Sequence, residues 1–364
     1  MEKDQLLVPA RRTVSDPRPP LDQFGDVSDW LHRRYINNEW VPALVKNLGQ
    51  VLKKDQEGRL LPEARAFGKE NMGVAVIGPS RSGKSALVNH VFSKYLGEDL
   101  RDQARGENAL YYRVKGDATA KSLSLDICDM CGYSAPRRHV TRHEAQALAA
   151  RRMQLAGVKL LVIDELHNAL GRRDEPVDLL LKGFLQDSHG LAVVVIGTEV
   201  LGDFLTDPMK KEVEGRFWET KLDPFDLPKF LHVVRAALRQ YADALNITLG
   251  PDVENDPHFP LRIIEGSGFS MGLSMRLIAT VMVSVHENGY GSASRHHFRE
   301  MCARMPGLAR RQNPFIVEDY SAMADLAEAV STGSLIHGLL EDDQTQMGVK
   351  VNKGKRAQGK GRQV

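Results

Sequence analysis

The side chains best suited to chemistry lie in one short stretch, Gly78-Pro-Ser-Arg-Ser-Gly-Lys-Ser85. It fits the pattern G-x-x-x-x-G-K-[ST] at every fixed position. Glycines let consecutive N–H groups of such a loop point at an anion, and the dipole of a following helix adds positive potential. Lys84 would reach the β- and γ-phosphates of a nucleotide, and the Ser85 hydroxyl would ligate Mg²⁺. The predicted phosphate-binding residues are Gly78, Pro79, Ser80, Arg81, Ser82, Gly83, Lys84, Ser85 and Ala86.

Two elements must position this loop. Val74–Ile77 is a short apolar run typical of a buried parallel strand, and the apolar residues from Ala86 to Val91 continue at helical spacing. Strand, glycine loop and helix therefore follow one another in the order that makes the pattern convincing. We predict a nucleotide-binding α/β domain.

A second set of candidates follows another apolar run. In Lys159–Glu165, four apolar residues lead directly into Asp164 and Glu165. The carboxyl ends of strands in open α/β sheets line the ligand site. We therefore expect Asp164 to hold Mg²⁺ through water and Glu165 to orient or deprotonate the attacking water. The pattern is weak by itself, and its place downstream of the phosphate loop strengthens it.

The remaining periodicity divides the chain into four segments. Strands are expected at Leu110–Val114 and Leu191–Ile196, and Ser122 is expected to cap the helix after the first of these. From Leu227 onward the pattern is wholly helical. The predicted segments are an arm with two helices (1–55), an α/β core (56–224), a helical lid (225–305), and a further helix near 317–330 with a disordered tail (306–364).

Composition excludes several classes of protein. The chain is 42% hydrophobic and 26% charged, as is ordinary for a globular protein. No apolar run approaches the length of a membrane span, and the N-terminus lacks an apolar signal-peptide core. We therefore expect a cytoplasmic protein with no membrane partner. The 3 cysteines cannot form a disulfide framework, and the net charge of +2 neither demands nor excludes nucleic acid.

With the phosphate loop, Asp164-Glu165, Thr198, Arg216 and Arg276 in this order, the chain resembles an AAA+ ATPase. The resemblance implies a P-loop NTPase core, with a parallel sheet flanked by helices, and a C-terminal all-α lid. It implies that Thr198 and Arg276 sense the γ-phosphate. It also implies that Arg216 acts in a neighbouring subunit as an arginine finger. Plainer roles stay open, because Thr198 could cap a helix and Arg216 could form a surface ion pair.

The stretch Val-Ile-Asp-Glu-Leu-His-Asn-Ala-Leu around Asp164 looks specifically like the TniB/TnsC family of transposition regulators, as do Ile-Gly-Thr-Glu199 and the residues from Arg216 to Phe225. The resemblance covers roughly residues 60–300. It implies ATP and Mg²⁺ as cofactors and assembly on double-stranded DNA as a hexameric or heptameric ring or a helical filament. It further implies two protein partners, a DDE transposase and a TniQ-type targeting protein. It also implies that the chain is a bacterial protein associated with the nucleoid.

The same resemblance places DNA contacts in the loop after the second strand. The candidates are Lys115, Thr119 and Lys121, with Arg137 and Arg138 as second choices. A solvated basic loop without DNA contacts would explain the same residues. The tail 349–364 carries six basic and no acidic side chains, which suits either nonspecific binding of phosphate backbones or solubility.

Three alternatives stay open. The chain could be another AAA+ machine, such as an initiator, a helicase loader or a secretion-linked ATPase. It could also be a scaffold that binds ATP and hardly hydrolyses it. Finally, Cys128, Cys131, His139 and His143 form a C-x₂-C-x₇-H-x₃-H array, although zinc fingers usually separate the two pairs by more residues.

Overall fold

The computed structural model describes residues 27–65, 71–100, 104–116, 118–134, 137–170, 176–187, 190–222, 227–305 and 313–317. The start of the predicted N-terminal arm, the predicted helix near 317–330 and the basic tail lie outside these residues. The account below concerns the described residues only.

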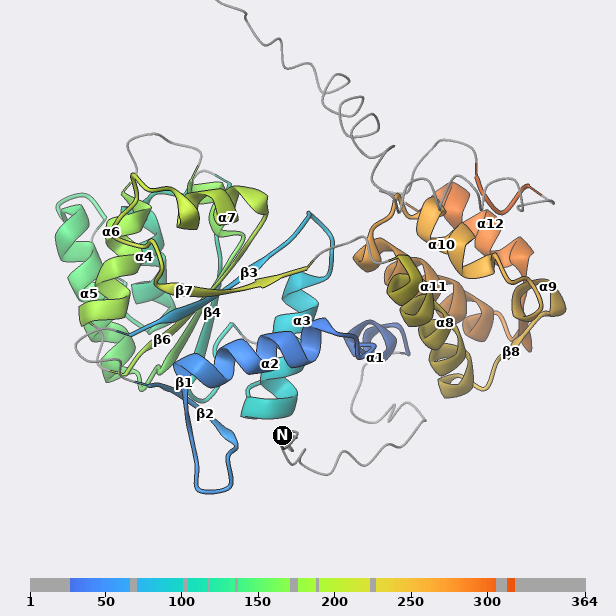
Figure 1. Ribbon diagram of the computed structural model, residues 1–364, viewed down its shortest axis with the longest axis horizontal. Coiled ribbons are helices and arrows are strands. Elements are labelled where there is room, and N and C mark those ends of the chain that lie inside the picture. The colour runs from blue at the N-terminus through green and yellow to red at the C-terminus, as the bar shows by residue number, and fades with distance from the viewer. Residues whose placement is uncertain are drawn as a thin grey trace, which may run out of the picture. The chain divides into compact units, whose positions relative to one another are not determined.

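A five-stranded parallel sheet forms the centre of the α/β part (Figure 1). Its order is β4 (Ala109–Arg113), β5 (Leu160–Asp164), β6 (Ala192–Gly197), β3 (Gly73–Ile77) and β7 (Phe217–Lys221). Because all five strands run the same way, the ends of β3, β4, β5 and β6 meet at one edge, where the phosphate loop and Asp164 lie. The predicted fold class is confirmed. Strand β7 was not predicted, since its short mixed sequence has no clear alternation.

Helices cover both faces of this sheet. On β3, Ala75 and Ile77 join one core and Val74 and Val76 the other, as the alternation of side chains along a strand requires. The first core is built with α4 (Ala120–Met130), α5 (Arg142–Leu155), α6 (Val177–Asp187) and α7 (Glu199–Thr206). The second core is built with α2 (Trp40–Val51), α3 (Lys84–Val91) and the π-turn η1 (Phe92–Leu96).

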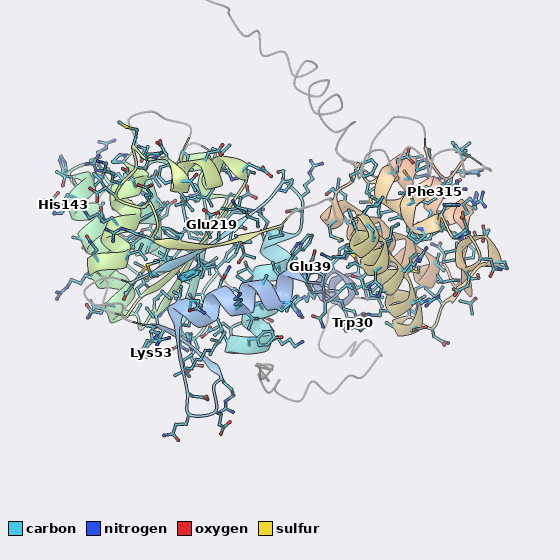
Figure 2. The ribbon with its side chains drawn as sticks, in the orientation of Figure 1. Trp30, Glu39, Lys53, His143, Glu219 and Phe315 are labelled. Atoms are coloured by element: carbon cyan, nitrogen blue, oxygen red, sulfur yellow. The ribbon has the colours of Figure 1, made fainter. Side chains whose placement is uncertain are left out.

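The C-terminal helices have a hydrophobic core of their own. They are α8 (Leu227–Ala244), α9 (Pro251–Glu254), α10 (Phe259–Gly266), α11 (Met271–Glu287) and α12 (Arg295–Arg304), with the short strands β8 (Thr248–Leu249) and β9 (Ser292–Ala293). Phe315 closes this core against Phe259 and Phe298, with ring centroids 5.6 and 5.7 Å away. Figure 2 labels Phe315 beside these helices.

The two N-terminal helices are buried in different cores. Trp30 and Leu31 of α1 (Val27–Arg33) pack among the C-terminal helices, whereas Leu44 and Leu48 of α2 belong to the second core beside the sheet. No single helix among the described residues is long and apolar enough to cross a membrane. Together, α10 and α11 have the length and composition of a membrane span, but they are bent by 112° relative to each other.

Two local features differ from the sequence prediction. Strands β1 (Leu52–Lys54) and β2 (Leu60–Ala64), which were not predicted, pair as an antiparallel hairpin, with Lys53 Nζ 2.5 Å from the Glu63 carboxylate. The cap of α4 is Thr119 and not Ser122. Thr119 Oγ1 accepts the Ser122 N–H at 3.1 Å, and Ser122 Oγ accepts the Thr119 N–H at 2.8 Å, which is the reciprocal geometry of a capping box.

Candidate nucleotide-binding site

The phosphate loop runs from the end of β3 into α3. Gly83, with φ +95°, precedes the first helical residue, Lys84, and Arg81 also has positive φ at +64°. The buried Lys84 ammonium donates hydrogen bonds to the carbonyls of Gly78 and Pro79, at 2.7 and 2.5 Å. Burial lowers the pKa of Lys84, and the carboxylates of Glu165, Glu199 and Asp164 oppose this shift in part. The loop therefore surrounds a buried cation that nearby carboxylates help to keep charged.

Asp164 ends β5 and is almost fully buried, at 1% exposure. Its Oδ2 accepts hydrogen bonds from the hydroxyls of Ser85, at 2.7 Å, and Tyr111, and its Oδ1 accepts the Glu165 N–H at 2.8 Å. Burial, reinforced by the Asp164 charge, raises the pKa of Tyr111, so this phenol remains a proton donor. The predicted pair Ser85 and Asp164 is therefore in direct contact, and the structure adds Tyr111 to it.

The Glu165 carboxylate lies between two basic side chains. Arg113, at the end of β4, is 3.7 Å from Oε1, and His167, in the 3₁₀ turn η2 (Leu166–Ala169), is 3.3 Å from Oε2. The backbone of Glu165 has φ +58°, in the left-handed region that non-glycine residues rarely occupy. Strain of this kind is concentrated at functional sites, which supports a chemical role for Glu165.

A pocket of about 470 Å³ connects these groups with the helix α11. Its lining comes from the phosphate loop, from Glu165 and Arg113, and from α11: Ser80, Arg81, Gly83, Lys84, Ser85, Ala86, Arg113, Glu165, Gly272, Leu273 and Arg276. The Arg81 carbonyl accepts the Gly272 N–H at 3.0 Å and the Ser270 hydroxyl at 2.9 Å. A Cβ on Gly272 would be 2.2 Å from that oxygen, so only glycine permits this contact.

A second pocket, of about 450 Å³, is lined by Met271, which is adjacent in sequence to Gly272 of the first pocket. It is lined from the segment before α2, from α8 and from α11: Asn37, Asn38, Glu39, Trp40, Pro228, Lys229, Phe230, His232, Val233 and Met271. Trp40, Phe230 and Met271 make it largely apolar, and the two asparagines supply amides. This composition suits a planar ligand with polar edges.

Six of the predicted nucleotide-site residues are outside the lining of the first pocket: Gly78, Pro79, Ser82, Asp164, Thr198 and Arg216. Thr198 follows β6 at the phosphate-loop edge of the sheet, and its side chain makes no capping hydrogen bond to α7. Arg216 precedes β7, and its carbonyl accepts the N–H of Gly73 at the start of β3, 2.9 Å away. The length of β3, about 15 Å at 3.3 Å per residue, separates Arg216 from the phosphate loop of its own chain.

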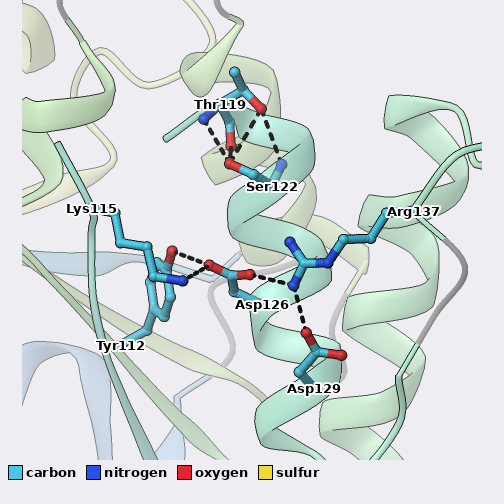
Figure 3. A network of polar contacts seen from close by, with 7 residues as sticks. All are labelled: Tyr112, Lys115, Thr119, Ser122, Asp126, Asp129 and Arg137. Carbon is cyan, nitrogen blue, oxygen red and sulfur yellow. Dashed lines mark hydrogen bonds and ion pairs between the residues drawn. The ribbon is translucent and has the colours of Figure 1, made fainter. Parts of the chain in front are cut away.

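Two of the predicted DNA-contact residues meet at one carboxylate (Figure 3). Lys115, after β4, and Arg137, after α4, lie 3.0 and 2.8 Å from the two oxygens of Asp126 in α4. The Tyr112 hydroxyl donates to Asp126 at 2.9 Å, and Arg137 also contacts Asp129 at 2.6 Å. Burial alone would raise the pKa of Asp126, but the hydrogen bonds from Arg137, Lys115 and Tyr112 outweigh it and lower that pKa.

The remaining DNA candidates are placed differently. Thr119 uses its side chain in the capping box of α4. Lys121 is half-buried in the first turn of α4. The hydrogen bonds from Thr141 and, to a smaller extent, the charge of Lys121 lower the pKa of Glu144 at the start of α5. Arg138 is exposed in the turn before α5. The structure thus joins Lys115 and Arg137 and leaves Thr119, Lys121 and Arg138 outside that cluster.

The cysteine and histidine array does not form a metal site among the described residues, where no three such ligands come together. Cys128 is buried in α4. Burial raises the pKa of its thiol to about 11, away from the thiolate that zinc binds.

Sequence reasoning missed several groups that the structure brings to the site, namely Tyr111, Arg113, His167, Glu199 and Gly272. For two of them a signal existed. Tyr111 and Arg113 are two residues apart on a predicted strand, so they share one face of it. Which carboxylates that face meets depends on the pairing of β4 with β5, which periodicity does not specify.

Comparison with known proteins agrees with this geometry. The family described as bacterial TniB protein matches residues 34–227. Among solved structures, the ORC1 protein of Aeropyrum pernix, in complex with DNA, is similar with a TM-score of 0.54 and 17% identity over 77% of this chain and 68% of that one. Cdc6p of Pyrobaculum aerophilum gives a TM-score of 0.45 and 15% identity over 73% and 68%. No curated protein matches significantly. The fold is therefore similar to that of the ORC1 protein. Because the family match covers more than half of its residues, the chain belongs to the TniB family.

Proposed function

We propose that this chain is an ATP-dependent regulator of DNA transposition that assembles on double-stranded DNA. In this proposal it recruits or activates a DDE transposase and links it to a TniQ-type targeting protein. The observation that carries the proposal is that Lys84, Ser85 and Glu165, from the two predicted motifs, line one pocket in a chain of the TniB family. The core, residues 56–224, would carry the chemistry, and the helices of residues 225–305 would act as its lid.

ATP would occupy both neighbouring pockets. Its phosphates would lie against the loop, where they are stronger acceptors for Lys84 than the carbonyls of Gly78 and Pro79, because charge-assisted hydrogen bonds exceed neutral ones. Arg276, from α11, lines the same pocket and would neutralise phosphate charge. The adenine would lie in the apolar pocket beside Trp40 and Phe230.

Ser85 and Asp164 fit a magnesium ion. Both offer hard oxygen ligands, their side chains are in contact at 2.7 Å, and Asp164 is buried next to Ser85, which lines the pocket. Magnesium bound there would neutralise phosphate charge. Glu165 would accept a proton from the attacking water after exchanging its contacts with Arg113 and His167. Thr198, at the tip of β6, would orient groups near the γ-phosphate.

Arg216 would act on the nucleotide of a neighbouring subunit. It lies at the sheet edge opposite to its own phosphate loop, so it can serve a site only across an interface. An interface that joins the edge with Arg216 to the edge with the pocket is heterologous. Such interfaces form closed rings or open helical filaments. The proposed assembly is therefore a ring or filament of copies of this chain.

DNA would lie against the cluster of Lys115 and Arg137. Both side chains are more than half exposed although Asp126 holds them, so their ammonium and guanidinium groups could donate hydrogen bonds to a phosphate backbone. Contacts of this kind position a protein without reading sequence. Lys121 and Arg138 lie near the same helices and would extend this basic surface.

Electron microscopy of the purified chain with duplex DNA tests the proposal. We expect rings or filaments with ATP or a slowly hydrolysed analogue, and none with ADP or without nucleotide. Particles that do not depend on DNA would contradict the proposal and favour a protein-remodelling ATPase.

A matched pair of variants tests the DNA surface. Lys115→Ala should weaken binding to all duplex sequences alike and reduce the slope of log K against log salt by about 1, because one phosphate contact is lost. Lys54→Ala, which removes an exposed charge on the β1–β2 hairpin, should leave both unchanged. Equal effects of the two substitutions would exclude a specific role for Lys115.

A further inference from the structure

Among the described residues, two side chains donate hydrogen bonds to the Asp164 carboxylate, one from the phosphate loop and one from outside it. Ser85 of the loop donates to Oδ2 from 2.7 Å, and Tyr111 of β4 donates to the same oxygen. The third donor is the backbone N–H of Glu165, which bonds Oδ1. Tyr111 is therefore a side chain outside the predicted motifs that holds the buried acid directly.

The pairing of β4 with β5 brings this phenol to Asp164. Tyr111 is opposite Val162 and Arg113 is opposite Asp164 in the parallel register. Side chains alternate along a strand, so Tyr111 faces the side of the sheet with α3 and Ser85. The adjacent Tyr112 faces the other side and donates to Asp126. Two neighbouring tyrosines thus serve two different carboxylates.

We propose that Tyr111 is a positioning residue for magnesium–ATP, which orients the Asp164 carboxylate toward Ser85 and the metal. This inference rests on the magnesium site proposed above. An aspartate carboxylate rotates broadly about its last torsion unless partners hold it. When Ser85 turns its oxygen to the metal, Tyr111 remains as the side-chain donor that keeps Oδ2 in place. Removing such outer-shell partners typically weakens metal binding or activity by about 10- to 100-fold.

The test removes only the hydroxyl group. In Tyr111→Phe the ring remains, so packing against the sheet core is kept. Tyr112→Phe is the matched control, because it deletes the same atom from the adjacent residue on the opposite face. Binding of a fluorescent, non-hydrolysable ATP analogue is measured against free Mg²⁺, and again in EDTA. This readout does not depend on turnover.

We expect Tyr111→Phe to raise the half-saturating Mg²⁺ concentration about tenfold or more, while binding in EDTA stays within about twofold of the wild type. Tyr112→Phe should follow the wild-type magnesium curve. In an Asp164→Ala background, Tyr111→Phe should cause no further shift, because the group that it positions is gone.

Several results would overturn the proposal. If Tyr111→Phe follows the wild-type magnesium curve, or shifts it equally in the Asp164→Ala background, Tyr111 does not act through Asp164. Loss of a cooperative thermal transition without nucleotide would assign the hydroxyl a structural role instead. If binding to the wild-type protein does not depend on Mg²⁺, the proposed metal site fails, and the role of Tyr111 fails with it.

Discussion

Replacing Gly272 by alanine is expected to weaken nucleotide binding, although it replaces glycine by a better helix former. Gly272 is in the first turn of α11, where helix propensity alone would favour alanine by up to about 1 kcal/mol. The new Cβ, however, would lie 2.2 Å from the Arg81 carbonyl oxygen and 3.1 Å from its carbon. The helix start and the phosphate loop would have to separate by at least about 1 Å to restore a normal contact.

This separation would break the hydrogen bonds that the Arg81 carbonyl accepts from Gly272 N–H and Ser270 Oγ, now 3.0 and 2.9 Å long. At about 1 kcal/mol each, their loss costs about 2 kcal/mol, which exceeds the gain in propensity. Because Gly272, Arg276 and Arg81 line one pocket, the displacement would also move Arg276 away from the proposed position of the phosphates. We expect nucleotide affinity to fall by about 5- to 30-fold.

Isothermal titration calorimetry with ATP and Mg²⁺ measures the effect. The control is Gly291→Ala, in the same helical part of the chain, where an added Cβ meets nothing within 4 Å. That substitution should leave the affinity unchanged. If Gly272→Ala binds ATP as tightly as the wild type does, the contact between α11 and the phosphate loop does not support the nucleotide site.

Three further predictions concern the acids and the arginine. Asp126→Asn should lower the free energy of unfolding, measured by chemical denaturation, by about 1–2 kcal/mol at pH 7. Because the pKa of Asp126 is lowered in the folded protein, this difference between the variant and the wild type should disappear as the pH falls below about 4. A difference that stays constant across that pH range would contradict the prediction. Glu165→Gln should keep ATP binding but reduce steady-state hydrolysis at least about 100-fold, and normal phosphate release would exclude it as the base. Arg216→Ala and Glu165→Gln should each lack ATPase activity alone and regain part of it when the two variants are mixed. At a mixed interface, the Glu165→Gln subunit supplies Arg216 and the Arg216→Ala subunit supplies Glu165. No recovery of ATP hydrolysis in the mixture would argue against action of Arg216 in trans.

The residues proposed to bind the phosphates could be predicted from the sequence because they are contiguous within each motif. Gly78–Ser85 lies between a buried strand and a helix, and Asp164 and Glu165 lie directly at a strand end. In both cases local periodicity predicts the element, and the element places the side chains at one edge of a parallel sheet. These features suffice for the fold class and for the core of the nucleotide site.

Other parts of the site depend on contacts between distant residues. Ser270 and Arg81 are 189 positions apart, and Tyr111 reaches Asp164 across 53 positions. Their meeting depends on strand register and on how α11 packs, which no local pattern records. The same holds for α1, whose Trp30 is buried among helices some 200 residues later. Local sequence thus determined which groups could bind a nucleotide, and long-range packing decided which other groups hold them in place.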